Sequence, residues 1–144
     1  MSLQDHLASA DIEFFSAREL TLQRRWRRTE TPPKHLWQNI IPTARVADTI
    51  RRAWGGPVIV GSGYRSPDYN TVVGGAPGSE HTVFRAMDIY PSNGHIEEFQ
   101  WVVKGVVAAY RDQGWNVGLG LYNRFVHIDV NAEGKRRNRT WDMR

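Results

Sequence analysis

The sequence predicts a single α+β domain in which a small antiparallel sheet is flanked by helices. Its 144 residues are the length of one ordinary domain. Amphipathic helix patterns alternate with short β-branched runs, and the last two runs are linked as a hairpin, which favours an antiparallel sheet over a doubly wound parallel one. We therefore treat 1–144 as one domain, and we expect about 1–13 and 135–144 to be flexible.

Two helices are expected in the first part of the chain. Ser16 and Glu19 form a Ser-x-x-Glu capping box, which predicts a helix through about Arg28. The segment "TETPPKHL" interrupts it. Pro42 suits the first turn of the second helix, and Gly55–Gly56 is typical of its end. This second helix carries an apolar stripe made of Ala44, Val46, Ala47, Ile50 and Trp54.

The remaining elements follow from periodicity. Apolar residues at i, i+3, i+4 and i+7 predict a helix over 96–113 that ends at Gly114. The segment "RSPDYNTVVGGAPGSE", residues 65–80, is expected to be a long functional loop. Strands are expected in "PVIVGSGY", "RAMDIY", "WNVGLGLY" and "RFVHIDV", the last two joined by a tight Asn-containing turn.

Composition limits the possible functions. The chain has no cysteine, so a disulfide scaffold, a thiolate metal site and a cysteine nucleophile are excluded. No apolar run is long enough for a transmembrane helix, so membrane insertion is not expected. The N-terminus lacks the pattern of a secretory signal. We therefore expect synthesis in the cytoplasm, and action on a cell wall or in a periplasm only if the protein is released or carried there by a virion.

The net charge of +4 favours an anionic partner, either a nucleic acid or an anionic wall polymer. Two basic segments, Arg24–Arg28 and Lys135–Arg139, contribute to this charge. Charge runs of this kind are usually solvated faces. Because no zinc-finger spacing or RNA-recognition motif accompanies them, nucleic acid is not the expected partner.

Polar residues that can bind a metal lie on two of the expected strands. In "FVHIDV", alternation places His127 and Asp129 on one face, roughly 7 Å apart, while the valines and the isoleucine face the core. In "AMDIY", Asp88 faces away from the apolar Met87 and Ile89. With His81 arriving from the loop, two imidazoles and a carboxylate would suit a catalytic zinc ion with a free position for water.

Each of these residues also has a structural interpretation. A single strand histidine such as His127 is more often a satisfied structural residue, and Asp129 by itself is typical of a strand-end carboxylate. The spacing from His81 to Asp88 is not that of a helical HExxH motif. Only the combination favours a metal.

Four ordered blocks, "SGYRSPDYN", "VGGAPGSEH", "AMDIY" and "GLGLYNRFVHIDV", resemble the zinc D-Ala-D-Ala carboxypeptidase and murein endopeptidase family. That family includes phage L-alanyl-D-glutamate endolysins, and the hedgehog signalling domain shares its fold. The likeness runs from about Phe14 to Trp141. The family pattern Ser-x-His-x-x-Gly-x-Ala-x-Asp, with a later strand histidine, is matched by Ser79, His81, Ala86, Asp88 and His127.

The resemblance implies one zinc ion per chain, bound by His81, Asp88 and His127. It also implies that Arg65 lies beside the metal, where it can hold a substrate carbonyl or carboxylate and stabilise an oxyanion. Tyr64 and Ser79 are implied as further substrate-binding residues. Without the resemblance, Arg65 reads as a structural loop arginine.

The sequence departs from the family pattern at two positions. Phe84 replaces the pattern's glycine, so we expect a reshaped loop after His81 and a narrower cleft. Arg124 stands where many members place a Glu or Asp as general base, three residues before the last histidine.

Asp129 is then the best substitute base, although it can instead orient a zinc-binding histidine. Glu80 and Glu133 are weaker candidates for the base.

The expected function is that of a zinc metallopeptidase that hydrolyses peptide bonds in bacterial peptidoglycan, as a D-Ala-D-Ala carboxypeptidase or a wall endopeptidase. A phage or prophage lysis enzyme or a virion protein is expected by analogy. Two alternatives stay open. One is an inactive zinc-binding structural or wall-binding module, such as a phage tail component, and the other is a nucleic-acid-binding protein.

Overall fold

The computed structural model describes residues 1–132, 134 and 136–144. The helices, in chain order, are α1 (Leu3–Ser9), α2 (Ala17–Thr21), the 3-10 helix η1 (Lys34–Asn39), α3 (Ile40–Trp54), α4 (Pro67–Val72) and α5 (Ile96–Asp112). The strands are β1 (Leu22–Gln23), β2 (Arg28–Thr29), β3 (Val58–Ser62), β4 (Ala86–Pro91), β5 (Val117–Leu121), β6 (Val126–Val130) and β7 (Thr140–Asp142).

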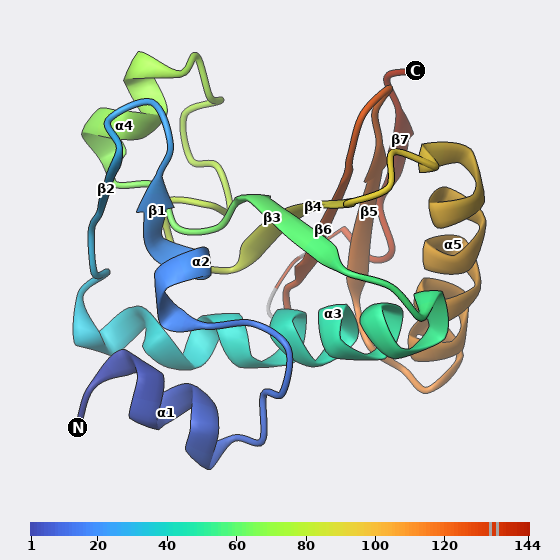
Figure 1. Cartoon of the computed structure of the whole chain (residues 1–144), viewed down its shortest axis with the longest axis horizontal. Helices are drawn as coiled ribbons and strands as arrows, with labels where there is room; N and C mark the ends of the chain where they lie inside the picture. The colour runs from blue at the N-terminus through green and yellow to red at the C-terminus, as the bar shows by residue number, and fades with distance from the viewer. Residues whose placement is uncertain (133, 135) are drawn as a thin grey trace.

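A five-stranded sheet in the order β3-β4-β6-β5-β7 forms the centre of the domain (Figure 1). All neighbouring strands in it are antiparallel except β5 and β7, which are parallel. A separate two-stranded sheet pairs β1 with β2. The predicted α+β class, with a small antiparallel sheet and flanking helices, is therefore confirmed, and the parallel pairing of β7 is an addition to it.

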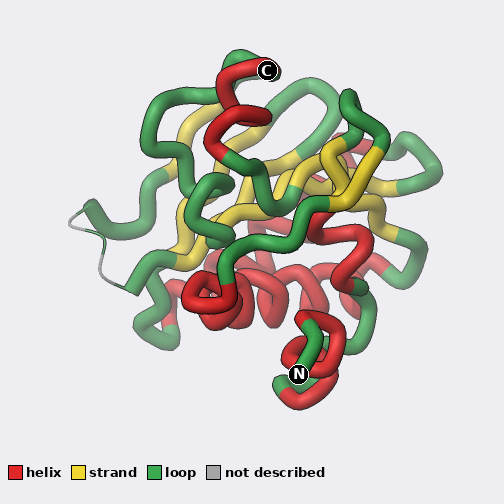
Figure 2. Tube along the Cα trace, turned by 90° about the vertical axis from the view of Figure 1, so that its left-hand side faces the viewer, coloured by secondary structure: helices red, strands yellow, loops and turns green. Residues whose placement is uncertain are grey.

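Helices α3 and α5 pack against each other and against the central strands, and Figure 2 shows helical turns gathered below the strands. Alternation along the central strands points one set of side chains toward these helices. Val126 and Ile128 of β6 and Met87 and Ile89 of β4 are all fully buried there. The opposite set includes Asp88 and His127, which are direct partners across β4 and β6. The helices thus cover the apolar face and leave the polar face for a site.

Several helix boundaries agree with the sequence prediction. Pro42 lies in the first turn of α3, which ends at Gly55 in the left-handed conformation with φ of 77°. Helix α5 covers Ile96–Asp112 and is followed by Gly114, whose φ is 95°. None of the described helices is both long and apolar enough to cross a bilayer.

The prediction that the first capped helix runs to Arg28 was wrong. The capping box of Ser16 and Glu19 is present, but α2 ends at Thr21. The chain then turns into the β1–β2 hairpin, where the Gln23 amide donates to the Tyr64 carbonyl and the Arg25 N–H donates to the Tyr69 hydroxyl. A longer helix would have bonded the Arg25 N–H internally, whereas here a distant side chain accepts from it, so tertiary contacts override helix propensity.

The prediction of an unbroken loop over 65–80 was also wrong, because α4 occupies Pro67–Val72. The Ser66 hydroxyl accepts a hydrogen bond from the Tyr69 N–H, and Pro67 occupies the first turn. A serine N-cap followed by proline is a recognised helix start. The signal was local, but the surrounding glycines and prolines obscured it.

Both termini, for which we expected flexibility, carry regular structure. Leu3 and Leu7 of α1 are buried in the core. At the other end, β7 pairs with β5, so that Trp141 lies beside Gly120. Residue Lys135 of the basic tail segment lies outside the described residues.

Phe84 adopts a backbone conformation that favours glycine, with φ of 57°. Its side chain is fully buried and packs edge-on against Tyr64, with ring centroids 5.9 Å apart. The left-handed backbone costs about 1–2 kcal/mol for a residue with a Cβ, and burial of the phenyl ring offsets it by a comparable amount. The loop after His81 thus keeps a glycine-like geometry, and Phe84 points into the core and does not narrow the cleft described below.

Substitutions at Phe84 should separate these two contributions. Phe84→Ala is expected to lower the free energy of unfolding by about 3–5 kcal/mol, since a large cavity remains. Phe84→Gly should be less destabilising than Phe84→Ala by about 1 kcal/mol, because glycine relieves the backbone strain. Urea unfolding measures both.

Phe99, also fully buried but within helix α5, is the matched control. There the order should reverse, since glycine costs about 1 kcal/mol more than alanine inside a helix. Equal destabilisation by alanine and glycine at position 84 would contradict the strain argument.

Candidate metal centre

Three predicted ligands converge from three segments of the chain. Asp88 lies on β4, His127 lies opposite it on β6, and His81 comes from the loop that precedes β4. One ligand atom from each residue lies within 4.8 Å of the other two. Among the described residues, no other group of three His, Asp or Glu side chains meets this criterion.

The ring nitrogens that point away from Asp88 have fixed partners. Nδ1 of His81 lies 2.7 Å from the carbonyl oxygen of Gly63, and Nε2 of His127 lies 2.8 Å from Oδ2 of Asp129. A carbonyl and an ionised carboxylate only accept hydrogen bonds, so these two nitrogens must carry the hydrogens. The remaining nitrogens, Nε2 of His81 and Nδ1 of His127, face Oδ1 of Asp88 at 3.2 and 2.8 Å.

This arrangement calls for a cation between the three groups. Two imidazole lone pairs and a carboxylate oxygen repel one another unless a proton or a metal ion lies among them. Burial disfavours the charged form of His127, but hydrogen bonds to Asp129 and Asp88 outweigh it and raise the pKa of His127 to about 9. Two nitrogens and one oxygen, with the outer ring nitrogens already bonded, fit a zinc ion well.

Asp129 lies behind His127 and is almost fully buried, with 1% of its side chain exposed. Its second oxygen accepts a hydrogen bond from Arg139 at 2.6 Å. Burial would raise the pKa of Asp129, but His127 and Arg139 outweigh burial and hold the pKa below its usual range. Both carboxylate oxygens are therefore engaged.

Strand β7 and the residue just before it supply two side chains that lie beside His127 and Asp129. Arg139 precedes β7 and bonds to Asp129, and the centroid of the Trp141 ring lies 5.2 Å from that of the His127 ring. Gly118 and Gly120 of β5 make room for them, since a Cβ at Gly118 would overlap Arg139 and Asp129, and one at Gly120 would overlap Trp141. The two glycines are directly opposite Asp129 and His127 in the strand register.

Arg65 is held by three side chains beside the predicted ligands. Its Nε donates to the Ser62 hydroxyl at 3.0 Å, its Nη1 to the Asn70 amide oxygen at 3.2 Å and its Nη2 to Oδ2 of Asp88 at 3.4 Å. A Cβ at Gly75 would collide with the Asn70 amide, so this part of the loop needs a glycine to admit it. Three of the five guanidinium N–H groups are used, which leaves two donors for a ligand.

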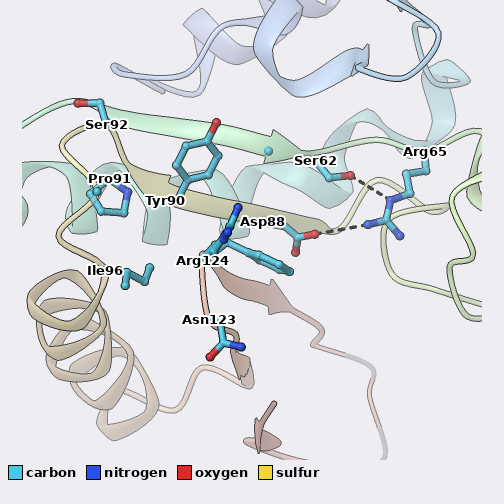
Figure 3. Close-up of a pocket in the computed structure, with 12 residues that line it drawn as sticks. Ser62, Arg65, Asp88, Tyr90, Pro91, Ser92, Ile96, Asn123 and Arg124 are labelled. Atoms are coloured by element: carbon cyan, nitrogen blue, oxygen red, sulfur yellow. Dashed lines mark hydrogen bonds and ion pairs between the residues drawn. The ribbon is translucent and has the colours of Figure 1, made fainter. Parts of the chain in front are cut away.

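A cleft of about 780 Å³ opens beside Asp88 and Arg65 (Figure 3). Strands β3 and β4 supply one wall, while the β5–β6 turn and the start of α5 supply the other. Its lining consists of Gly61, Ser62, Arg65, Asp88, Tyr90, Pro91, Ser92, Gly94, Ile96, Asn123, Arg124 and Phe125. The volume is in the range of small-molecule and peptide sites.

The other predicted site residues lie elsewhere. Tyr64 is 5% exposed and belongs to the core, and it does not line the cleft. The Ser79 hydroxyl accepts a hydrogen bond from the His81 N–H, so it shapes the loop that carries this ligand. Glu80 is paired with Arg85 at 3.1 Å. Glu133 lies outside the described residues.

Sequence reasoning missed the residues that support the cluster, namely Ser62, Gly63, Asn70, Gly75, Gly118, Gly120, Arg139 and Trp141. One signal was available. The alternating glycines of "GLGLY" leave one face of a strand bare, which indicates that something bulky approaches it. The sequence could not show that Arg139 and Trp141 fill this space, because they come from a separate segment of the chain.

Comparison with known proteins agrees with this geometry. A search of curated proteins finds no significant match. A model of the family described as Peptidase M15 matches residues 13–129, which is most of the chain and includes all three predicted ligands. The chain therefore belongs to the Peptidase M15 family.

Proposed function

We propose that this protein is a zinc-dependent peptidase that hydrolyses peptide bonds in bacterial peptidoglycan. The observation that carries the proposal is the convergence of Nε2 of His81, Oδ1 of Asp88 and Nδ1 of His127 at a cleft that Arg65 also lines. Membership of a peptidase family supports the reaction class. Peptidoglycan as the substrate rests on the resemblance of the four sequence blocks described above.

The side chains divide the work in a simple way. His81, Asp88 and His127 would hold the zinc ion, which when bound supplies a Lewis acid and lowers the pKa of a water ligand. Arg65 keeps two N–H donors free beside Asp88. These donors can bind the substrate carbonyl oxygen and stabilise the negative charge that develops on it. Because Ser62, Asn70 and Asp88 fix the guanidinium, little reorganisation is needed during the reaction.

For Asp129 we propose a positioning role in place of the base role. Its lowered pKa makes it a weak base, and His127 and Arg139 occupy both of its oxygens. A carboxylate that accepts the outer N–H of a metal-binding histidine orients the ring and strengthens the ligand.

Substitutions of Asp129 should distinguish the two roles. Asp129→Ala is expected to weaken zinc binding by about ten- to a hundredfold, and Asp129→Asn by less, since its amide oxygen can still accept from His127. Cleavage by both variants should return toward the wild-type kcat at saturating zinc. A kcat that stays low in the fully zinc-loaded variants would instead support a base role. Zinc competition with a fluorescent chelator and kcat at several zinc concentrations provide the measurements.

A muropeptide digest tests the proposed activity. Purified, zinc-loaded protein is incubated with peptidoglycan, and released fragments are identified by mass spectrometry. We expect fragments from cut peptide bonds, their loss after treatment with a chelator and their return with added zinc. The fragment masses also distinguish a carboxypeptidase, which releases one residue, from an endopeptidase, which divides the peptide.

The second candidate function is an inactive zinc-binding structural or wall-binding module, for example in a phage particle. Arg124, which cannot act as a base, favours this candidate. It predicts zinc or wall binding with no chelator-sensitive fragment. The appearance of such a fragment would exclude it, and the absence of any fragment from zinc-loaded protein would contradict the peptidase proposal.

A further inference from the structure

The charge balance of the cleft is uneven. Two arginines, Arg65 and Arg124, line it, and Asp88 is the only acidic residue among the described lining residues. Oδ1 of Asp88 faces the two histidines, and Oδ2 accepts from Arg65. The negative charge of Asp88 is thus already engaged, and the second arginine has no counter-charge within the cleft.

Arg124 itself has no partner among the described residues. Its side chain is exposed, and it makes no hydrogen bond or ion pair with any of them. Figure 3 shows the contrast, since dashed lines join Arg65 to Ser62 and Asp88 while none reaches Arg124. A guanidinium with all five donors free at the wall of a cleft is available to a ligand.

The turn that carries Arg124 is held firmly. The Tyr122 and Phe125 rings on either side of it are stacked, with centroids 4.4 Å apart. The Tyr122 carbonyl accepts from Gln100 of α5, and its hydroxyl accepts from the Trp141 indole. Arg124 therefore projects from a braced backbone, which reduces the entropy lost when its side chain binds a ligand.

We propose that Arg124 forms a carboxylate-binding subsite of the cleft, so that the preferred substrates are peptides with a free carboxylate near the cut bond. The inference rests on the proposed function and specifies its substrate class. A planar guanidinium binds a carboxylate with two parallel hydrogen bonds. Ser62, Ser92 and Asn123 line the same cleft and can donate hydrogen bonds to the rest of the peptide. Arg124, which stands where many family members place the general base, would thus bind the substrate.

The carboxylate can come from the C-terminus of the peptide or from a carboxyl group within it. Four probes separate these sources: the pentapeptide L-Ala-γ-D-Glu-L-Lys-D-Ala-D-Ala, its C-terminal carboxamide, its version with the glutamate carboxyl converted to carboxamide, and the doubly amidated peptide. Binding to zinc-loaded protein is measured by calorimetry, and cleavage is followed separately by chromatography.

We expect wild-type protein to bind one of the acids about ten- to a hundredfold more tightly than the matching amide, as for a hydrogen-bonded charge pair. The single amidation that weakens binding identifies which carboxylate, the C-terminal one or that of the glutamate, Arg124 binds. Arg124→Gln should reduce this preference to less than about threefold. The change should come chiefly from weaker binding of the acid, while the affinity for the amide stays nearly the same. Arg18→Gln is the matched control, because it removes one exposed arginine that does not line the cleft and should leave the preference unchanged.

Equal binding of all four peptides by wild type, or a preference that survives Arg124→Gln, would overturn the inference. If all four peptides bind equally well and are still cleaved, the proposed peptidase function is supported and the proposed subsite is wrong. Conversely, an acid preference that depends on Arg124 without any cleavage would retain the subsite and count against the peptidase function.

Discussion

His127→Ala is expected to abolish zinc binding and peptide cleavage together. The substitution removes one of three proposed ligands and also leaves the buried Asp129 without its histidine partner. We expect about one zinc ion per wild-type chain after incubation and desalting, and none in the variant. Plasma mass spectrometry gives the metal content, and the muropeptide digest gives the activity.

His81→Ala should behave in the same way, which guards against a result caused by misfolding of a single variant. His35, an exposed histidine in η1, is the control, and His35→Ala should retain both zinc and activity. Circular dichroism and thermal unfolding check that each variant is folded. Cleavage that persists in folded, zinc-free His127→Ala would overturn the proposed role of the metal.

Arg65→Ala is expected to lower kcat by about a hundred- to a thousandfold, the usual effect of removing a donor that stabilises an oxyanion. Zinc content should change little, because the three proposed ligands remain. Arg65→Lys should recover only a small part of the rate. A lysine ammonium cannot reproduce the fork that binds Ser62, Asn70 and Asp88 at the same time.

Steady-state kinetics on the cleaved muropeptide provide the measurement, with zinc content determined on the same samples. Arg18→Ala removes an exposed arginine outside the cleft and should keep the wild-type kcat. A wild-type kcat in zinc-loaded Arg65→Ala would show that Arg65 takes no part in the chemistry. A raised KM with unchanged kcat would assign it to substrate binding alone.

The candidate site could be predicted largely because its proposed ligands obey local rules. Side chains alternate along a strand, so the faces of His127 and Asp88 could be assigned before their strands were known to be neighbours. In the structure the two residues are direct partners on neighbouring strands, which the sequence did not predict. The hairpin-linked strands and the long amphipathic helix were predictable for the same reason, since each depends on residues close together in the chain.

The supports of the site follow no such local rule. The Gly63 carbonyl that orients His81 lies 18 residues before it, and Arg139, which binds Asp129, comes from the tail expected to be flexible. Helix α2 stops at Thr21 because the following segment bonds to Tyr64 and Tyr69, more than forty residues away along the chain. Periodicity reports which face a residue occupies, but it does not report which distant group meets that face.

By itself, the sequence determined the α+β class, the main strands and helices, the three side chains proposed to bind a metal and the absence of cysteine chemistry. Only the tertiary structure decided that Phe84 keeps a glycine-like backbone, that Asp129 is enclosed between His127 and Arg139, and that Arg124 faces the cleft without a counter-charge. The physical reason is that local periodicity and capping act within a few residues, whereas burial, counter-charges and hydrogen-bond partners are set by segments that meet only when the chain folds.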